Sequence, residues 1–255
     1  MLIESITDSA QIIVSGHRGY KAAYPENTLL SFQQAVAAGV HMLELDLRMS
    51  KDKQVVIIHD ETVDRTTNGS GKVGEMTWEQ LQALDAGGWM GPSFAGLKIP
   101  SFEQFCQLML AYPHLLLNIE VKPSSDAEEV VDAAIAMLKQ FSLYERCVFT
   151  CFDAAIIAYL HDRYAAKTQG FRGDKMTNFV EGEQGTYSKM WAIALEMSHL
   201  NRSDVKLFKH MGKQVWSYCP DTAQDVLYSV GAGATVMTCN NPMPALQLKK
   251  LLEQA

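Results

Sequence analysis

Short apolar or β-branched runs alternate with segments of helical period along almost the whole 255-residue chain. Such alternation predicts a parallel sheet, because a crossover between parallel strands needs a dozen or more residues and usually contains a helix. The strand-like runs are 12–15, 42–49, 55–59, 115–121, 147–151, 167–171, 191–197, 214–218 and 235–238. The helix-like segments are 28–38, 102–111, 127–141, 154–163, 177–188, 204–211, 222–230 and 245–253.

The number of strand-like runs decides between two folds. Only residues 50–54 separate the second run from the third, which is too short for a parallel crossover, so 55–59 should pair antiparallel with 42–49 as a hairpin. Eight parallel strands then remain, as in a TIM (β/α)₈ barrel. A doubly wound open sheet is the alternative, but no Gly-rich phosphate fingerprint follows the first run. We therefore expect one barrel domain spanning residues 1–255.

Residues 60–100 differ from the rest of the chain, because they are rich in Gly and Pro and show only a short helical signal near 77–84. A loop of this length in a compact domain is usually a lid or a binding loop. We expect an inserted, lid-like segment within the barrel.

Composition limits the partners and the compartment. The chain is 47% hydrophobic with a net charge of −7, which argues against nucleic acid or an anionic membrane as the main partner. Five scattered cysteines without a Cys-x-x-Cys spacing indicate reduced thiols. No run approaches the length of a membrane span, and residues 1–15 lack the pattern of a secretory signal. We expect a cytoplasmic protein without stable membrane insertion; its oligomeric state does not follow from the sequence.

The first strand ends in Gly16-His17-Arg18-Gly19, followed by Pro25-Glu26-Asn27-Thr28 before the first helix. His17 and Arg18 would lie at the carboxyl end of a barrel strand, which is the active-site face. A hydrogen-bonded histidine at a loop start is the alternative. Asn27 or Thr28 can cap the helix, and Glu26 can either face the site or take part in the cap region.

Charged residues alternate with apolar ones in the run 42–49, so Glu44, Asp46 and Arg48 share one face. A half-solvated edge strand would show the same pattern. Barrel strands are covered on both faces, however, and unpaired buried charge is costly. A divalent cation bound by Glu44 and Asp46, Mg²⁺ or Ca²⁺, would remove that cost. If the hairpin turn is centred near Asp52, His59 lies opposite residue 45, beside both carboxylates.

The run 115–121 repeats this pattern, with Asn118, Glu120 and Lys122 on one face. Glu120 would be a third carboxylate ligand and Lys122 a cation for a phosphate oxygen. A Glu–Lys pair that satisfies itself at a strand end is the alternative.

Several motifs together resemble the glycerophosphodiester phosphodiesterase family. They are Gly16-His17-Arg18-Gly19, Pro25-Glu26-Asn27-Thr28, Glu44-Leu45-Asp46, His59-Asp60, Arg65-Thr66-Thr67, Asn68-Gly69 and Glu120-Val121-Lys122. The resemblance implies a TIM barrel in which Glu44, Asp46 and Glu120 hold Mg²⁺ or Ca²⁺. It also implies that His17 and His59 form the acid–base pair, and that Arg18 and Lys122 bind the phosphate.

The C-terminal half resembles the family less closely. Trp216-Ser217-Tyr218-Cys219-Pro220 stands where members commonly show Trp-Thr-Val-Asn, and Asn240 replaces an Asp of the last strand's end. Trp216 is a candidate substrate-binding aromatic, with a core tryptophan as the alternative. The change at Asn240 removes a negative charge near the mouth, which should leave the catalytic core intact and bear on the choice of alcohol.

The resemblance implies hydrolysis of a small-molecule glycerophosphodiester to glycerol 3-phosphate and an alcohol. Attack by the substrate's own 2-hydroxyl or by water both stay open, as does the acid or base role of each histidine. One alternative is a phospholipase D-like enzyme acting on lysophospholipids, which an exposed apolar rim at Trp89, Met90 and Phe94 would favour. Another is a catalytically silent barrel that only binds phosphodiesters or a protein partner.

Overall fold

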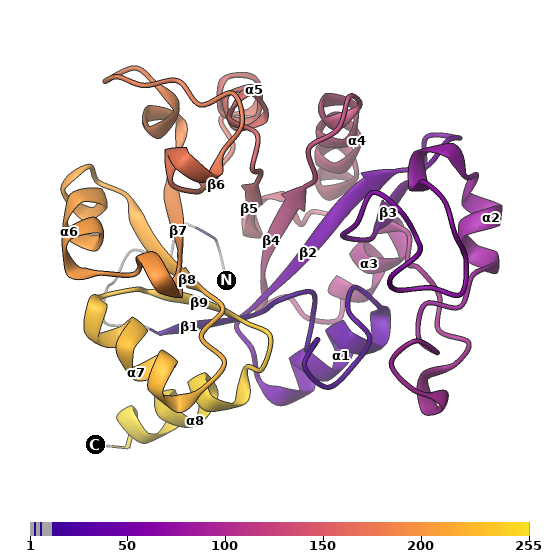
Figure 1. The fold of residues 1–255 in the computed structure, drawn as a ribbon, viewed down its shortest axis with the longest axis horizontal. Coiled ribbons are helices and arrows are strands. Elements are labelled where there is room, and N and C mark those ends of the chain that lie inside the picture. Colours follow the sequence, from indigo (N-terminus) through magenta and orange to yellow (C-terminus); the bar gives the residue numbers. More distant parts are fainter. Residues whose placement is uncertain (1–2, 4–5, 7–11, 255) are drawn as a thin grey trace.

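The computed structural model describes residues 3, 6 and 12–254, which form a closed barrel of parallel strands surrounded by helices (Figure 1). The sheet order is β1-β9-β8-β7-β6-β5-β4-β2-β3, and pairing of β1 with β2 closes it. β3 pairs antiparallel with β2. The strands are β1 Ile13–Gly16, β2 Met42–Met49, β3 Val55–Ile57, β4 Leu116–Val121, β5 Cys147–Thr150, β6 Thr168–Gly170, β7 Ala192–Glu196, β8 Gln214–Tyr218 and β9 Val236–Cys239. The expected TIM barrel with a hairpin strand is confirmed.

The helices lie outside the strands, and most begin at a side-chain cap. Thr77 and Ser101 form capping boxes, which satisfy backbone N–H groups that have no partner within the helix. The helices are α1 Leu29–Ala38, α2 Trp78–Ala83, α3 Phe102–Met109, α4 Ala127–Gln140, α5 Ala154–Tyr164, α6 Arg202–His210, α7 Ala223–Ala232 and α8 Met243–Leu252. Each corresponds to a helix-like segment of the sequence.

One expected helix is wrong. Residues 177–188 form no α-helix; the stretch between β6 and β7 holds the 3-10 turns Gly173–Lys175 and Thr186–Lys189. Asn178 and Gly182 have positive φ angles of 53° and 102°, which a right-handed helix excludes. The apolar spacing of this stretch comes instead from Phe179 and Tyr187, which pack edge to face 4.9 Å apart.

The β2–β3 hairpin has the register expected from the sequence. Leu47 pairs with Ile57 and Met49 with Val55, and the Ile58 backbone N–H donates to the Asp46 carbonyl at 3.1 Å beyond the last paired residue. Continuing this register places His59 opposite residue 45. The histidine is therefore carried to the end of the barrel where the carboxyl ends of the parallel strands meet.

The inserted segment packs beside the barrel on a small core of its own (Figure 1). This core contains Val56, Ile58, Val63, Val73, Leu81, Ala86 and Ile99, all buried. Because β3 supplies Val56 and Ile58 follows it directly, the segment is anchored to the hairpin.

In the part of the chain that the structure describes, no helix combines the length and the apolar character needed to cross a membrane. The thiols of Cys106, Cys147, Cys151, Cys219 and Cys239 are all unpaired, and all but Cys219 are buried.

Candidate active site

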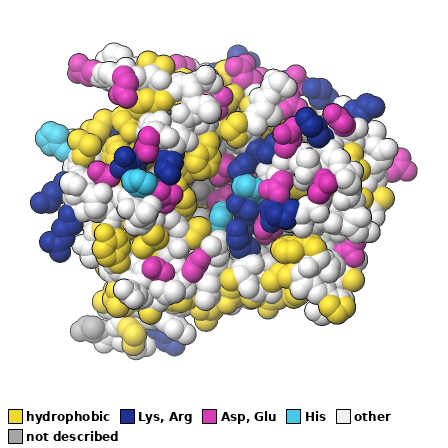
Figure 2. All heavy atoms as spheres, viewed as in Figure 1, with side chains coloured by type: hydrophobic (Ala, Val, Ile, Leu, Met, Phe, Trp, Pro, Cys, Tyr) yellow, Lys and Arg dark blue, Asp and Glu magenta, His cyan; other side chains and the backbone are white. Residues whose placement is uncertain are grey.

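A cavity of about 150 Å³ opens where the carboxyl ends of the barrel strands meet. Histidine, acidic and basic side chains gather near the middle of this face of the molecule (Figure 2). The lining residues are His17, Arg18, Glu44, His59, Asn118, Glu120, Lys122, Thr150, Phe152, Gln169, Phe171, Ala194, Tyr218 and Thr238. In a parallel barrel this end presents the residues that follow each strand, so nearly every strand contributes to one site.

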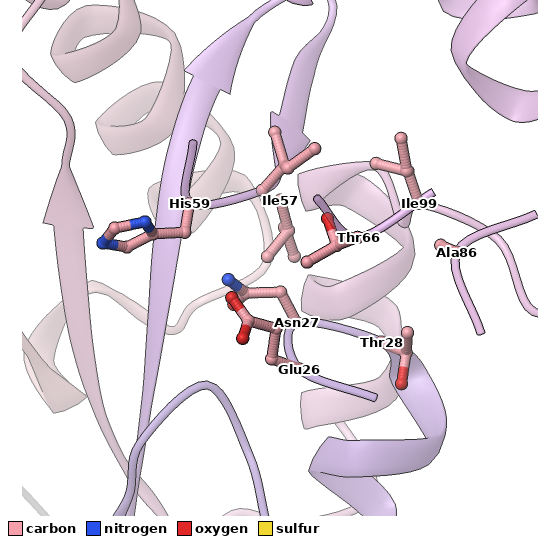
Figure 3. A pocket seen from close by; sticks show the side chains of 9 residues that line it. Glu26, Asn27, Thr28, Ile57, His59, Thr66, Ala86 and Ile99 are labelled. Atoms are coloured by element: carbon pink, nitrogen blue, oxygen red, sulfur yellow. The ribbon is translucent and has the colours of Figure 1, made fainter. Parts of the chain in front are cut away.

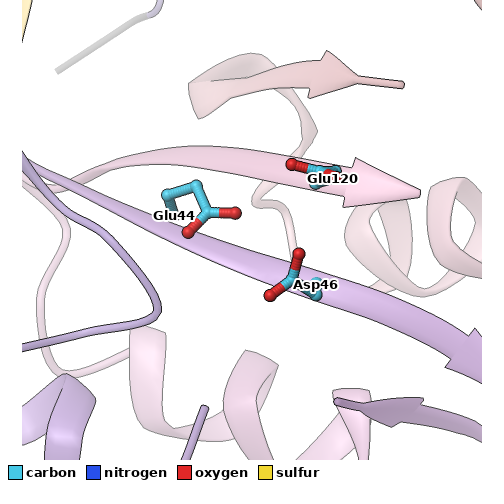
Figure 4. Close-up of side chains that lie close together, drawn as sticks. All are labelled: Glu44, Asp46 and Glu120. Carbon is cyan, nitrogen blue, oxygen red and sulfur yellow. The ribbon is translucent and has the colours of Figure 1, made fainter. Parts of the chain in front are cut away.

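Three carboxylates meet at this cavity, and two of them, Glu44 and Glu120, line it. Glu44 and Asp46 come from β2 and Glu120 from β4, and one oxygen from each lies within 4.8 Å of the others (Figure 4). The register explains the arrangement, because Glu44 pairs with Asn118 and Asp46 with Glu120. Alternation with period two then turns all three toward the barrel interior.

Burial makes this cluster electrostatically demanding. Burial and repulsion from Asp46 raise the pKa of Glu44 well above its usual value, and the same two causes raise the pKa of Glu120. Burial also acts to raise the pKa of Asp46, but nearby Lys122 and Arg18 outweigh it and lower that pKa. Glu44 Oε1 and Asp46 Oδ1 are buried without a hydrogen-bond partner. Unpartnered, convergent carboxylate oxygens are the donor set that a hard divalent cation takes.

His59 is held on the β3 side by a carboxylate. Its Nδ1 lies 2.6 Å from Asp60 Oδ1, and its carbonyl accepts a hydrogen bond from Arg48 Nε at 2.9 Å. Burial lowers the pKa of His59, with Asp46 acting in the opposite direction. Arg65, from the inserted segment, donates to Asp60 at 2.6 Å and so fixes the residue behind the imidazole.

Arg65 also begins a chain of ion pairs that ends at the carboxylates. Its guanidinium donates to both oxygens of Glu26, at 2.8 and 3.0 Å. Glu26 accepts from Arg18 Nη1 at 2.8 Å, and Arg18 Nε lies 3.2 Å from Asp46. Although burial acts to raise it, hydrogen bonding to Arg65 and the Arg18 charge lower the pKa of Glu26 to about 2. Glu26 therefore belongs to the site.

The cap and the site use different residues of the Pro25-Glu26-Asn27-Thr28 motif. Thr28 is the N-cap of α1 and accepts from the Ser31 backbone at 3.2 Å. Asn27 does not cap the helix, and its side-chain amide donates a hydrogen bond to Asp46 Oδ2 at 2.8 Å.

His17 also lines the cavity and has a neutral partner. Its Nδ1 is 2.6 Å from Asn240 Oδ1, and its Nε2 is 3.8 Å from Glu44 Oε2. Burial, followed by the charges of Arg18 and Lys21, lowers the pKa of His17 to about 3. The structure thus brings His17 and His59 to one cavity beside the three carboxylates.

Lys122 pairs with Glu120 at 2.5 Å and lies 3.4 Å from Asp46. The self-satisfied Glu–Lys pair considered from the sequence is therefore present, yet Lys122 also lines the cavity. Arg18 lines it too, while its backbone N–H donates to Glu44 at 2.8 Å.

Trp216 corrects an expectation, because it is fully buried and lines no part of the cavity. Its ring packs edge to face against the ring of Trp191, with the centroids 6.0 Å apart. Tyr218, two residues further along β8 on the same face, reaches the cavity instead. The sequence could have indicated Tyr218, because on one face of a barrel strand the later residue lies nearer the mouth.

Other cavity residues escaped the sequence reasoning. Phe152 and Phe171 stack with ring centroids 3.6 Å apart, and Tyr218 meets Phe171 edge to face at 5.6 Å. Each of these residues ends a strand or follows one, and this position is the one sequence feature that could have placed it at the cavity. Asn240, expected to leave the histidine and carboxylate core untouched, contacts His17.

A second, very small cavity lies behind His59 (Figure 3). It is lined by Glu26, Asn27, Thr28, Ile57, Ile58, His59, Thr66, Ala86 and Ile99. Its volume of about 10 Å³ is at most enough for one water molecule, so it is no substrate site.

A closed parallel barrel with histidines and convergent carboxylates at its carboxyl end has the arrangement of a (β/α)₈-barrel hydrolase. The model of the glycerophosphoryl diester phosphodiesterase family matches residues 17–243. The chain therefore belongs to this family.

Relatives and solved structures agree with this assignment. A glycerophosphodiester phosphodiesterase of Bacillus subtilis is 34% identical over 258 aligned positions, covering 94% of this chain and 87% of that protein. One from Caldanaerobacter subterraneus is 38% identical over 142 residues, 55% of this chain. The chain spans only 58–61% of the length of this and two other curated relatives that it matches.

Among solved structures, an Oleispira antarctica phosphodiesterase in complex with the product sn-glycerol-3-phosphate has a TM-score of 0.82. It is 24% identical, and the match covers 95% of this chain and 98% of that one. A glycerophosphodiester phosphodiesterase from Agrobacterium tumefaciens has a TM-score of 0.78 at 22% identity, covering 92% and 98%. At these identities the likeness supports the barrel fold.

Proposed function

We propose that this protein hydrolyses glycerophosphodiesters to glycerol 3-phosphate and an alcohol. One observation carries the proposal: both histidines line a single cavity at the active-site end of the barrel together with Glu44 and Glu120, and Asp46 lies against these two carboxylates. The family, and the product sn-glycerol-3-phosphate bound to the Oleispira antarctica neighbour, support the choice of substrate.

Glu44, Asp46 and Glu120 would hold one divalent cation, Mg²⁺ or Ca²⁺. Their oxygens converge, and Glu44 Oε1 and Asp46 Oδ1 accept no hydrogen bond, so the donor set fits a hard cation. When bound, such a cation neutralises phosphate oxygens and lowers the pKa of a coordinated hydroxyl.

His17 and His59 would exchange protons with the attacking hydroxyl and the leaving alkoxide. Each imidazole has its Nδ1 engaged, by Asn240 or Asp60, which leaves Nε2 available to the cavity. Burial lowers the pKa of both imidazoles, that of His17 to about 3, which favours the neutral form that can accept a proton. The nucleophile is the substrate's 2-hydroxyl or water, and detection of a cyclic phosphate product separates these routes.

The rest of the cavity wall would bind the two ends of the substrate. The Lys122 ammonium and the Arg18 guanidinium lie on the side of the carboxylates, where a phosphate would be neutralised. Phe152, Phe171 and Tyr218 form an apolar wall of the same cavity, which suits the non-reacting part of the alcohol.

The decisive experiment is a turnover panel with and without a chelator. Glycerophosphocholine, glycerophosphoethanolamine and glycerophosphoglycerol are assayed for release of glycerol 3-phosphate. We expect turnover that EDTA abolishes and Mg²⁺ or Ca²⁺ restores. Release of no glycerol 3-phosphate from any of them would overturn the proposal, and chelator-resistant turnover would overturn its metal.

The aromatic wall is the observation that favours a second substrate class, the lysophospholipids. Trp89, on the inserted segment, is 42% exposed, but no residue of that segment lines the cavity. A lysophosphatidylcholine arm in the same panel decides between the two: we expect glycerophosphocholine to be the better substrate.

We also propose a cytoplasmic location, which the five unpaired thiols support.

A further inference from the structure

The side chain of Asn240 lies between His17 and Asp221, and its two contacts determine how its amide is turned. Asn240 Oδ1 is 2.6 Å from His17 Nδ1, and Asn240 Nδ2 donates to Asp221 Oδ2 at 2.6 Å. An ionised carboxylate only accepts hydrogen bonds, so the amide NH₂ must face Asp221. The opposite orientation would set oxygen against oxygen. The amide oxygen therefore faces the imidazole.

This orientation selects one tautomer of the histidine. An amide oxygen cannot donate, so the hydrogen of the neutral imidazole must reside on Nδ1. Nε2 then keeps its lone pair. We propose that Asp221 and Asn240 form a positioning pair that holds His17 as the Nδ1–H tautomer, with Nε2 as the proton acceptor in the cavity. The catalytic consequence rests on the proposed function; the tautomer itself does not.

Three neighbouring strand ends build this support. Asp221 follows β8, Asn240 follows β9 and His17 follows β1, and these strands are adjacent in the sheet. Asp221 Oδ1 accepts from the backbone N–H of Asn240 at 2.7 Å and of Asn241 at 3.0 Å. The His17 N–H donates to the Cys239 carbonyl at 2.9 Å. The backbone thus fixes both the carboxylate and the imidazole about the amide.

A purely structural role for Asp221 predicts a different outcome from a positioning role. In Asp221→Asn the side-chain oxygen can still accept from both backbone N–H groups, so the loop keeps its hydrogen bonds. The new NH₂ group, however, would face the NH₂ group of Asn240. Asn240 would have to turn over and donate to His17 Nδ1, which favours the Nε2–H tautomer and removes the acceptor from the cavity.

The test compares wild type, Asp221→Asn and the exchange variant Asp221→Asn/Asn240→Asp. In the exchange variant a carboxylate at 240 accepts from His17 Nδ1 and from the new amide at 221, which restores the original hydrogen direction. Asp225→Asn is the matched control, because Asp225 caps the nearby helix α7. The readouts are the ring ¹⁵N shifts of His17 at pH 8, the melting temperature, and kcat and KM for glycerophosphocholine.

We expect Nδ1–H in wild type, the control and the exchange variant, and Nε2–H in Asp221→Asn. We expect kcat of Asp221→Asn to fall roughly 10²–10⁴-fold with KM little changed, and the exchange variant to recover most of it. An unchanged tautomer in a folded Asp221→Asn, or no recovery in a folded exchange variant, would overturn the proposal. If wild type shows Nδ1–H but no turnover, the proposed function fails while the positioning pair stands.

Discussion

The two halves of the barrel mouth are built differently. The half formed by β1 to β4 carries the titratable groups, and ion pairs from Arg65 through Glu26 and Arg18 to Asp46 hold them. The half formed by β5 to β9 presents stacked rings, from residues at the ends of β5, β6 and β8, and is held by packing. Under the proposed function, bond breaking would belong to the charged half and the choice of alcohol to the aromatic half.

The largest effect is expected from Asp46→Asn. This change removes a ligand of the proposed cation and leaves Arg18 and Lys122 without their shared partner. Because a Lewis acid contributes several kcal/mol, kcat/KM should fall on the order of 10⁴-fold, with loss of Mg²⁺ binding in calorimetry. Glu196→Gln, a carboxylate at the end of β7 outside the cavity, is the control. If Asp46→Asn kept metal binding and turnover, the chemistry could not be assigned to the charged half.

His59→Asn separates proton transfer from metal binding within the charged half. Loss of one acid or base should lower kcat on the order of 10³-fold while calorimetric metal affinity stays close to wild type. His161→Asn is a matched control, because His161 also contacts the following residue, Asp162, at 2.8 Å but lies near the surface. If kcat fell equally in His59→Asn and His161→Asn, the loss would come from the fold and not from proton transfer.

Arg65→Gln tests whether the inserted segment supports the charged half. Glu26 would keep Arg18 but lose two hydrogen bonds, and Asp60 would lose its contacts with Arg65 behind His59. We expect kcat to fall about tenfold, the low end of the loss caused by removing a residue that supports a metal site from outside its ligands. Because the Arg65 side chain is 45% exposed, solvent screening limits the stability loss to about 1 kcal/mol, or about 3 °C in Tm at pH 7.

The pH dependence of that stability loss has a definite sign. The pKa of Glu26 is depressed to about 2, so its stabilising contribution is present above the ordinary carboxyl pKa and is lost as the pH falls toward 2. The difference in unfolding free energy between wild type and Arg65→Gln should therefore shrink between pH 5 and pH 2, measured by urea unfolding. A difference that stays constant over this range would show that Glu26 is not its source.

The smallest effect is expected from Phe152→Leu in the aromatic half. Loss of ring contact should raise KM about fivefold for substrates with a bulky alcohol and change kcat little, since about 1 kcal/mol of apolar contact is removed. Glycerophosphoglycerol, with its small polar alcohol, should be affected less. A large fall in kcat for every substrate would instead place Phe152 with the charged half, where its ring already lies 5.8 Å from the Lys122 ammonium.

Local patterns predicted most of the charged half. Alternation with period two placed Glu44, Asp46 and Glu120 on inward faces, and the short β2–β3 connection set His59 opposite residue 45. The helix predicted at 177–188 is absent from the structure. Asn178 and Gly182 adopt positive φ angles there, and the spacing of apolar residues does not reveal them.

The sequence by itself determined the barrel, its hairpin strand and the side chains that can bind a cation. These depend on periodicity and on short separations along the chain. Only the tertiary structure decided that Trp216 is buried while Tyr218 reaches the cavity, that Arg65 supports Glu26, and that Asn240 turns its oxygen toward His17. Such contacts join residues up to 223 positions apart, and their geometry exists only after the barrel has closed.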